Sequence, residues 1–238
     1  MKKFKTAFTT SEVLFTLLIL GVIAVLTIIV LSQETSGRDR ILRVKKAYSV
    51  VANSYDQARV DYGAVNVWDT FDSGSIADKI GKRLNLKKSC GTANLQRGNE
   101  CFPDCPKIYK ADGGSLEVCT SSNVATMMTN DGFAYAFQIE DPSCTIDVTG
   151  SNASASLDLK QICGTFLLDI DSSTTSRNKN FYGRDLFLFY ISREGLFPTG
   201  LDIDTRYPKL ANECKQQVLK DEFGCSALMV YGDGKLEK

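Results

Sequence analysis

The chain has 238 residues, of which 43% are hydrophobic, and its 28 basic residues balance its 28 acidic residues. This length allows one compact domain with a membrane element, and the balanced charge does not indicate a nucleic-acid partner. Histidine is absent, which excludes Ser-His-Asp and Cys-His catalytic sites and zinc sites that use histidine. The composition therefore favours a protein that is not an enzyme and has no certain cofactor.

The first predicted element is a hydrophobic helix near the start of the chain. Val13–Leu31 is a run of 19 uncharged, mostly apolar residues. As a helix it would rise about 28 Å, close to the ~30 Å hydrocarbon core of a bilayer. Lys2, Lys3 and Lys5 precede it, and the positive-inside rule then places the N-terminus in the cytoplasm. We expect a single-pass protein of the inner (cytoplasmic) membrane with an extracytoplasmic head.

A cleaved secretory signal is the alternative for this run. It would need an apolar region of about 7–15 residues followed by a small-x-small cleavage site. The run is longer, and "VLSQETSG" after it lacks such a site. A plain anchor fits better, but it explains Glu12, at the edge of the run, only as an interfacial carboxylate that reaches water.

A second helical pattern follows the polar stretch 32–40, where Gly37 would permit a bend. Apolar residues recur there at steps of three and four, which predicts an amphipathic helix packed on a sheet. A coiled coil is the alternative, but the stripe covers three heptads and uses small and aromatic residues. The stripe consists of Ile41, Val44, Tyr48, Val51, Tyr55, Ala58 and Tyr62.

The pattern of the remaining sequence predicts two short helices and several strands. "SIADKIGKRLNL" and "LANECKQQVLKDEF" have helical patterns, and "MTNDGFAYAFQI" has the turn and alternation of a hairpin. "CGTFLLDID", "GRDLFLFYI" and "CSALMVYGDGK" are apolar enough for further strands. The expected fold is α+β: a long N-terminal helix, transmembrane in its first half, packed on an antiparallel, disulfide-rich head of about four strands.

Eight cysteines lie downstream of the apolar run, and the first 89 residues contain none. An even number on one side of a membrane segment predicts an oxidising compartment and up to four disulfides. Buried free thiols are the alternative. The disulfide candidates are Cys90, Cys101, Cys105, Cys119, Cys144, Cys163, Cys214 and Cys225.

Sequence spacing favours local cysteine pairs. Cys214 and Cys225 flank a predicted short helix and form the first expected pair, and Cys144 with Cys163 is the next. The other four would pair among themselves. A zinc site at Cys101-x-x-x-Cys105 with two further cysteines is an alternative, but this spacing does not match a CxxC knuckle.

A polar loop between two predicted strands gathers oxygen ligands. Asp169, Asp171 and Asp185, with Asn178 and Asn180, offer the carboxylate and amide oxygens that Ca²⁺ prefers. A solvated loop of turn-forming residues is the alternative. Calcium is therefore a possible cofactor, and Asp169, Asp171 and Asp185 are its candidate ligands.

The N-terminal stretch "KKFKTAFTTSEVLFTLLILGVIAVLTII" resembles that of type IV prepilins and type II secretion pseudopilins. In that family a basic leader ends in a small residue, a phenylalanine begins the mature chain, and its fifth residue is a glutamate. Ala7, Phe8 and Glu12 match this spacing. The usual leader residue is Gly rather than Ala, and Ile29 stands where many members have a helix-kinking Pro. "YGRDLFLF" also resembles part of the family's metal-loop pattern, although its Asn-Gly turn is replaced here.

The resemblance implies processing and partners. Prepilin peptidase would cleave between Ala7 and Phe8 and methylate the amine of Phe8. Glu12 would pair with the charged N-terminus of a neighbouring subunit, because opposite charges attract strongly at low dielectric. The partners implied are other pilin or pseudopilin subunits, the peptidase and the inner membrane. After assembly, the filament would be periplasmic or on the cell surface.

Two functions follow from these expectations. The first is a structural subunit of a type IV pilus-like or type II secretion filament, which assembles through its N-terminal helix. The second is a singly anchored membrane protein whose disulfide-rich head binds a ligand. A secreted enzyme is a weaker third. The expected segments are a leader (1–7), a transmembrane half-helix (8–31), an amphipathic half-helix (32–62) and a globular head (63–238).

Overall fold

The computed structural model describes residues 10–65, 68, 72–94, 99–102, 123–150, 152, 154–171, 183, 185–208 and 224–232. At positions 12 and 24–37 it describes the helical backbone without the side chain. The chain divides into two compact units, Met1–Arg40 and Ile41–Lys238.

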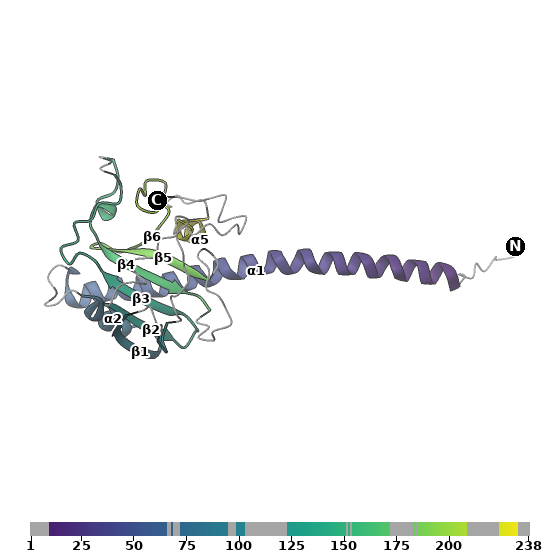
Figure 1. Ribbon diagram of the computed structural model, residues 1–238, viewed down its shortest axis with the longest axis horizontal. Coiled ribbons are helices and arrows are strands. Elements are labelled where there is room, and N and C mark those ends of the chain that lie inside the picture. Colours follow the sequence, from purple (N-terminus) through teal and green to yellow (C-terminus); the bar gives the residue numbers. More distant parts are fainter. Residues whose placement is uncertain are drawn as a thin grey trace. The chain divides into compact units, whose positions relative to one another are not determined.

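The longest element is helix α1, Thr10–Tyr62, drawn in purple and blue in Figure 1. Its backbone is helical throughout, including Gly37, so the helix is not interrupted there. Residues 10–40 of α1 are the described part of the first unit, and from Ile41 onward α1 belongs to the second.

The second unit is built on one antiparallel sheet of six strands whose spatial order follows the chain (Figure 1). Each strand pairs with the next, which is the pattern of a meander. The predicted hairpin is confirmed: Thr129 and Ala134 flank a turn in which Gly132 has φ of 80°, a conformation that favours glycine. The strands are β1 Leu86–Ala93, β2 Val124–Thr129, β3 Ala134–Ile139, β4 Ile162–Asp169, β5 Leu186–Ser192 and β6 Leu196–Pro198.

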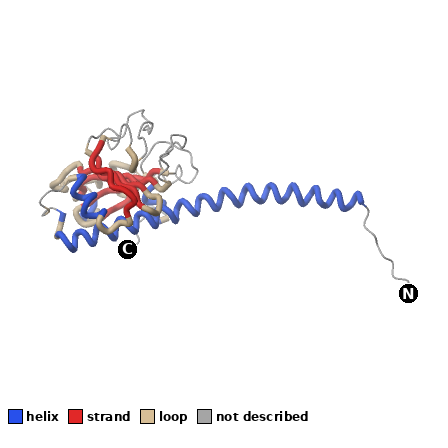
Figure 2. The backbone as a smooth tube through the Cα atoms, turned by 90° about the horizontal axis from the view of Figure 1, so that it is seen from below, coloured by secondary structure: helices blue, strands red, loops and turns tan. Residues whose placement is uncertain are grey.

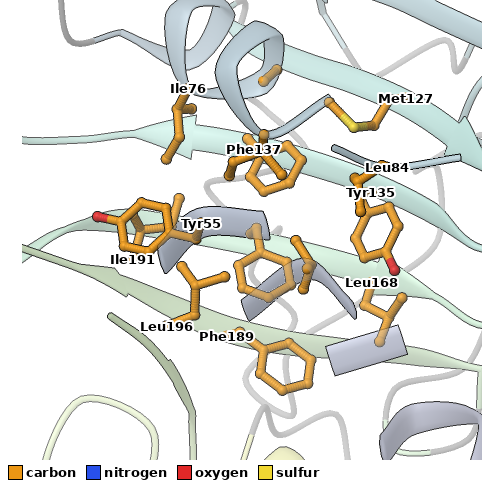
Figure 3. Close-up of a cluster of buried hydrophobic side chains, with 14 of the residues drawn as sticks. Tyr55, Ile76, Leu84, Met127, Tyr135, Phe137, Leu168, Phe189, Ile191 and Leu196 are labelled. Carbon is orange, nitrogen blue, oxygen red and sulfur yellow. The ribbon is translucent and has the colours of Figure 1, made fainter. Parts of the chain in front are cut away.

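Both faces of the central strands are buried. Alternation along β3 sends Tyr135 and Phe137 to one face and Ala136 to the other, because side chains in a strand point to opposite sides in turn. The first face carries the aromatic core shown in Figure 3, in which the rings of Phe166 and Phe189 stack with their centroids 4.8 Å apart. The opposite face is covered in part by loop side chains such as Phe102.

The C-terminal part of α1 packs against the aromatic face of the sheet. Val44, Val51 and Tyr55 are fully buried there, whereas Ile41 and Tyr62, at the ends of the predicted stripe, are exposed. The Tyr55 hydroxyl donates to the carbonyl oxygen of Ser192 on β5 at 2.6 Å. The predicted amphipathic stripe is therefore confirmed over 44–58. Figure 2 shows helix and sheet in layers.

Short helices complete the second unit. Helix α2, Ser73–Gly81, confirms the predicted amphipathic helix, and Asp72 caps it by accepting from the Ser75 N–H at 2.7 Å. A 3₁₀ helix, η3, covers Leu157–Lys160. Helix α5, Ser226–Tyr231, contacts β5 and β6.

The expected fold class needs correction in three respects. The sheet has six strands rather than about four. The N-terminal helix is divided between two compact units at Arg40, and only its part from Ile41 onward belongs to the unit that contains the sheet. Within the described part of the chain, no helix combines the length and the hydrophobicity needed to cross a membrane.

The last finding overturns the transmembrane half-helix, 8–31, and the single-pass inner-membrane localisation.

Individual strand predictions were also wrong. "CSALMVYGDGK" contains helix α5 instead of a strand, because a short apolar run suits either state and its contacts decide between them. Strand β1 escaped prediction because it is mostly polar and broken by two register shifts. Strand β6 has only three residues. The helix predicted at 210–223 lies outside the described residues.

Candidate assembly interface

The most distinctive surface of the molecule is the apolar segment of α1, which we define as Val13–Ile23. Its nine large apolar side chains have exposed fractions between 43% and 69%. Successive helical residues are about 100° apart, so these side chains cover every side of the helix. The nine are Val13, Leu14, Phe15, Leu17, Leu18, Ile19, Leu20, Val22 and Ile23.

The two remaining residues of the apolar segment do not make it polar. The Thr16 hydroxyl donates to the carbonyl oxygen of Val13, one helical turn earlier, at 2.9 Å. Gly21 adds no side chain, and a Cβ built there would meet nothing within 4 Å. The segment thus presents hydrocarbon on all sides, and a helix with this pattern requires a surrounding partner of similar polarity.

The residues predicted for processing and assembly lie at the edge of this segment. Ala7 and Phe8 are outside the described residues. Glu12 is on the helical backbone one residue before Val13, but its side chain is also outside the description. The cleavage, the methylation and the role of Glu12 therefore stay predictions.

Two disulfides are present in the described part of the second unit. Cys144 and Cys163 form the bond that their spacing predicted, with Cα atoms 3.9 Å apart. Cys90 bonds to Cys101, which agrees with pairing among the four cysteines whose partners were left open. Every described cysteine is oxidised, so free thiols and zinc ligation do not apply to these residues.

The remaining cysteines cannot be paired from the described residues. Cys225 is disulfide-bonded, but Cys214, its predicted partner, is outside the description. Cys105 and Cys119 are also outside it. The pairs that involve these three positions stay predictions.

The candidate calcium ligands lie at the ends of β4 and β5. Asp169 is fully buried at the end of β4 and accepts from the Asp171 N–H at 3.0 Å. The backbone carbonyl oxygen of Asp185 accepts from the Ile170 N–H at 3.0 Å. Among the described residues, no three acidic, cysteine or histidine side chains gather closely enough to hold a metal. Asn178 and Asn180 lie outside the description.

A buried carboxylate that the sequence analysis missed organises the loop after β6. Asp204 is 5% exposed, and its oxygens accept from the Tyr190 hydroxyl at 2.9 Å and from the Gly200 N–H at 3.0 Å. The N–H groups of Arg206 and Tyr207 also donate to it, at 3.0 and 2.9 Å. Burial raises the pKa of Asp204 above its ordinary value, although these donors oppose the shift. No sequence motif marked this aspartate.

A groove of about 930 Å³ lies between α2, β1 and the end of α1. Lys79 and Lys82 line it together with Tyr62. The Lys82 ammonium donates to the Tyr62 hydroxyl at 3.0 Å, and the Lys79 ammonium lies 4.8 Å from the ring centroid of Trp68. Both cations therefore have partners within the chain.

Comparisons with known proteins identify no relative. The chain matches no family model, no curated protein and no solved structure.

Proposed function

We propose that this protein is a structural subunit that polymerises through α1, in a filament of the type IV pilus or type II secretion kind. The observation that carries the proposal is the apolar segment, Val13–Ile23, which is exposed on every side. Burying one such side chain is worth about 1.5–3 kcal/mol. Burial of the whole segment among several copies would therefore stabilise helix–helix association strongly.

The prepilin-like residues support the same function from the sequence. Phe8 and Glu12 stand at the spacing at which that family places its first mature residue and its glutamate. Within a bundle of apolar helices, the amine of one subunit would neutralise Glu12 of its neighbour, and an unpaired buried charge is costly. We propose related subunits and prepilin peptidase as the partners.

Charge placed on the apolar segment should prevent assembly. Leu14→Glu with Leu18→Glu puts two carboxylates on one side of the helix, where a neighbouring helix would have to bury them. We expect the variant to lose all filament or large-oligomer formation, measured by electron microscopy and sedimentation velocity. Thermal unfolding of the second unit should not change, because neither side chain belongs to its core.

Leu157→Glu is the matched control for this experiment. Leu157 on η3 is 68% exposed, as Leu14 is 69% exposed, but it lies on the second unit, outside the apolar segment. It should assemble normally. Assembly of the Leu14→Glu, Leu18→Glu variant at the level of this control would overturn the proposed function. Glu12→Ala should reduce incorporation and leave unfolding unchanged.

A further inference from the structure

The side of α1 that faces away from the sheet carries a self-complementary pattern, which we call the outer stripe. Leu42 and Val60 are 66% and 85% exposed, and they lie 18 residues apart, which is five full turns and places them on the same side of the helix. Fully buried Val51 lies midway between them on the opposite side. The outer stripe comprises the exposed residues Leu42, Lys45, Lys46, Ser49, Asn53, Asp56, Gln57 and Val60.

The outer stripe is symmetric about the level of Val51: similar residues stand at equal distances before and after it. An apolar residue stands nine positions before it (Leu42) and nine after it (Val60). Small polar Ser49 and Asn53 stand two before and two after. A two-fold axis at this level would bring each residue against its counterpart in an antiparallel second copy.

The charges obey the same symmetry. Lys45 is six positions before Val51 and Asp56 is five after it. The two-fold axis would therefore place Lys45 of one copy beside Asp56 of the other. Lys46 and Gln57 are arranged likewise on the other flank. Within one chain, Lys45 and Asp56 are 11 residues apart, about 16 Å along the helix, and cannot pair with each other. A pair between Lys45 and Asp56 could therefore form only between two copies.

The existing partners of these groups leave them accessible. Lys46 contacts Asp131 at 2.9 Å with 58% of its side chain exposed, and Asp56 lies 3.7 Å from Arg59 with 61% exposed. Burial raises the pKa of Asp56, and Arg59 partly opposes the shift. A lysine from a second copy would stabilise this carboxylate further.

We propose that the outer stripe is a homodimer interface, in which the α1 helices of two copies pack antiparallel about Val51. Leu42 of each copy contacts Val60 of the other, and Lys45 pairs with Asp56. Small Ser49 and Asn53 at the centre let the helices approach closely. The stripe is about 27 Å long and one helix wide. A contact of this size buries less surface than the roughly 800 Å² per partner of a standard interface. The dimer is thus a weak, reversible one.

This contact is independent of the proposed polymerisation, because it uses residues 42–60 rather than the apolar segment. It is also closed: a two-fold interface uses the same patch on both copies and adds no third subunit. Dimerisation through the outer stripe would therefore hold copies in pairs instead of extending a filament.

Charge reversal tests the proposal. The full chain, with its apolar segment covered by detergent micelles, is examined by sedimentation equilibrium under density-matched conditions. Lys45→Glu or Asp56→Lys alone should weaken the dimer about tenfold, because each substitution turns two symmetry-related attractions into repulsions. The double variant should return to within about threefold of the original affinity, because Glu at 45 then faces Lys at 56.

Lys87→Glu on β1, an exposed charge outside the outer stripe, is the matched control and should leave the affinity unchanged. Circular dichroism verifies that each variant folds. A monomer at every concentration up to the millimolar range would overturn the proposal, as would a double variant that stays weak. Species that grow beyond two copies would also overturn it, because they indicate a staggered contact instead of a two-fold one.

Discussion

At the scale of single residues, Asp204 shows how a buried carboxylate can order a loop without any catalytic role. Four donors converge on its two oxygens from Tyr190, Gly200, Arg206 and Tyr207. Removing the carboxylate would leave these donors buried without their acceptor, which costs about 1–3 kcal/mol for each group that stays unsatisfied.

Asp204 should also make the stability of the fold depend on pH. Because burial raises its pKa in the folded state, the folded protein holds the proton more tightly than the unfolded chain does. The stabilisation from this residue is fully present below the unfolded value of about 3.9, and it is lost as pH rises through the folded pKa. Asp204→Asn, which cannot ionise, should lack this dependence.

Urea unfolding of the natural chain and of Asp204→Asn between pH 3 and pH 7 checks this expectation. The stability of the natural chain relative to the variant should fall as pH rises from about 4. Asp141 acts in the opposite direction, because hydrogen bonds from Thr145 lower its pKa, but it is common to both proteins. A difference that rises with pH would contradict the assignment to Asp204.

At the scale of elements, the contact between α1 and the sheet depends on one face of the helix. Val51 is fully buried, whereas its neighbour Val50 is 38% exposed. Tyr48 and Tyr55 add hydrogen bonds from their hydroxyls to the carbonyl oxygens of Leu196 and Ser192, at 2.7 and 2.6 Å. Apolar burial and these polar contacts together hold α1 in register with β5 and β6.

The adjacent valines provide a matched pair of substitutions. Val51→Ala should lower the free energy of unfolding by roughly 2 kcal/mol, because it removes buried methyl groups and leaves a cavity against the sheet. Val50→Ala should change it by less than about 0.5 kcal/mol. Chemical denaturation of the two variants measures both values, and equal losses would contradict the packing of α1 described here.

At the scale of the whole molecule, the chain combines a well-packed second unit with an exposed apolar segment in the first. Two disulfides, Cys90–Cys101 and Cys144–Cys163, fix loops of the second unit to β1 and β4. The apolar segment has no comparable packing within the described residues. This contrast supports the proposal that the second unit is the stable folded part and that the first unit supplies the contacts for assembly.

The proposed function predicts a shortened mature chain. Cleavage between Ala7 and Phe8 removes Lys2, Lys3 and Lys5 and no acidic residue, so 25 basic residues would remain against 28 acidic ones, a formal charge of −3. Intact-mass spectrometry of assembled material should find a chain that begins at N-methylated Phe8. A chain that retains residues 1–7 in assembled material would refute the processing step.

The sequence by itself determined the features that depend on local pattern. The stripe at steps of three and four identified the buried face of α1 at Val44, Val51 and Tyr55, because helical periodicity brings such residues to one side. Alternation around the Asn-Asp-Gly turn identified the β2–β3 hairpin. Short spacing also identified the pair Cys144–Cys163.

Only the tertiary structure decided the features that depend on distant contacts. The run at Ser226–Tyr231 became a helix, and the three residues of β6 became a strand, because their packing and pairing partners outweigh weak local preference. The site of Asp204 arises from donors on separate segments, which no local motif records. Local periodicity specifies which face of an element is apolar, whereas packing decides what covers that face.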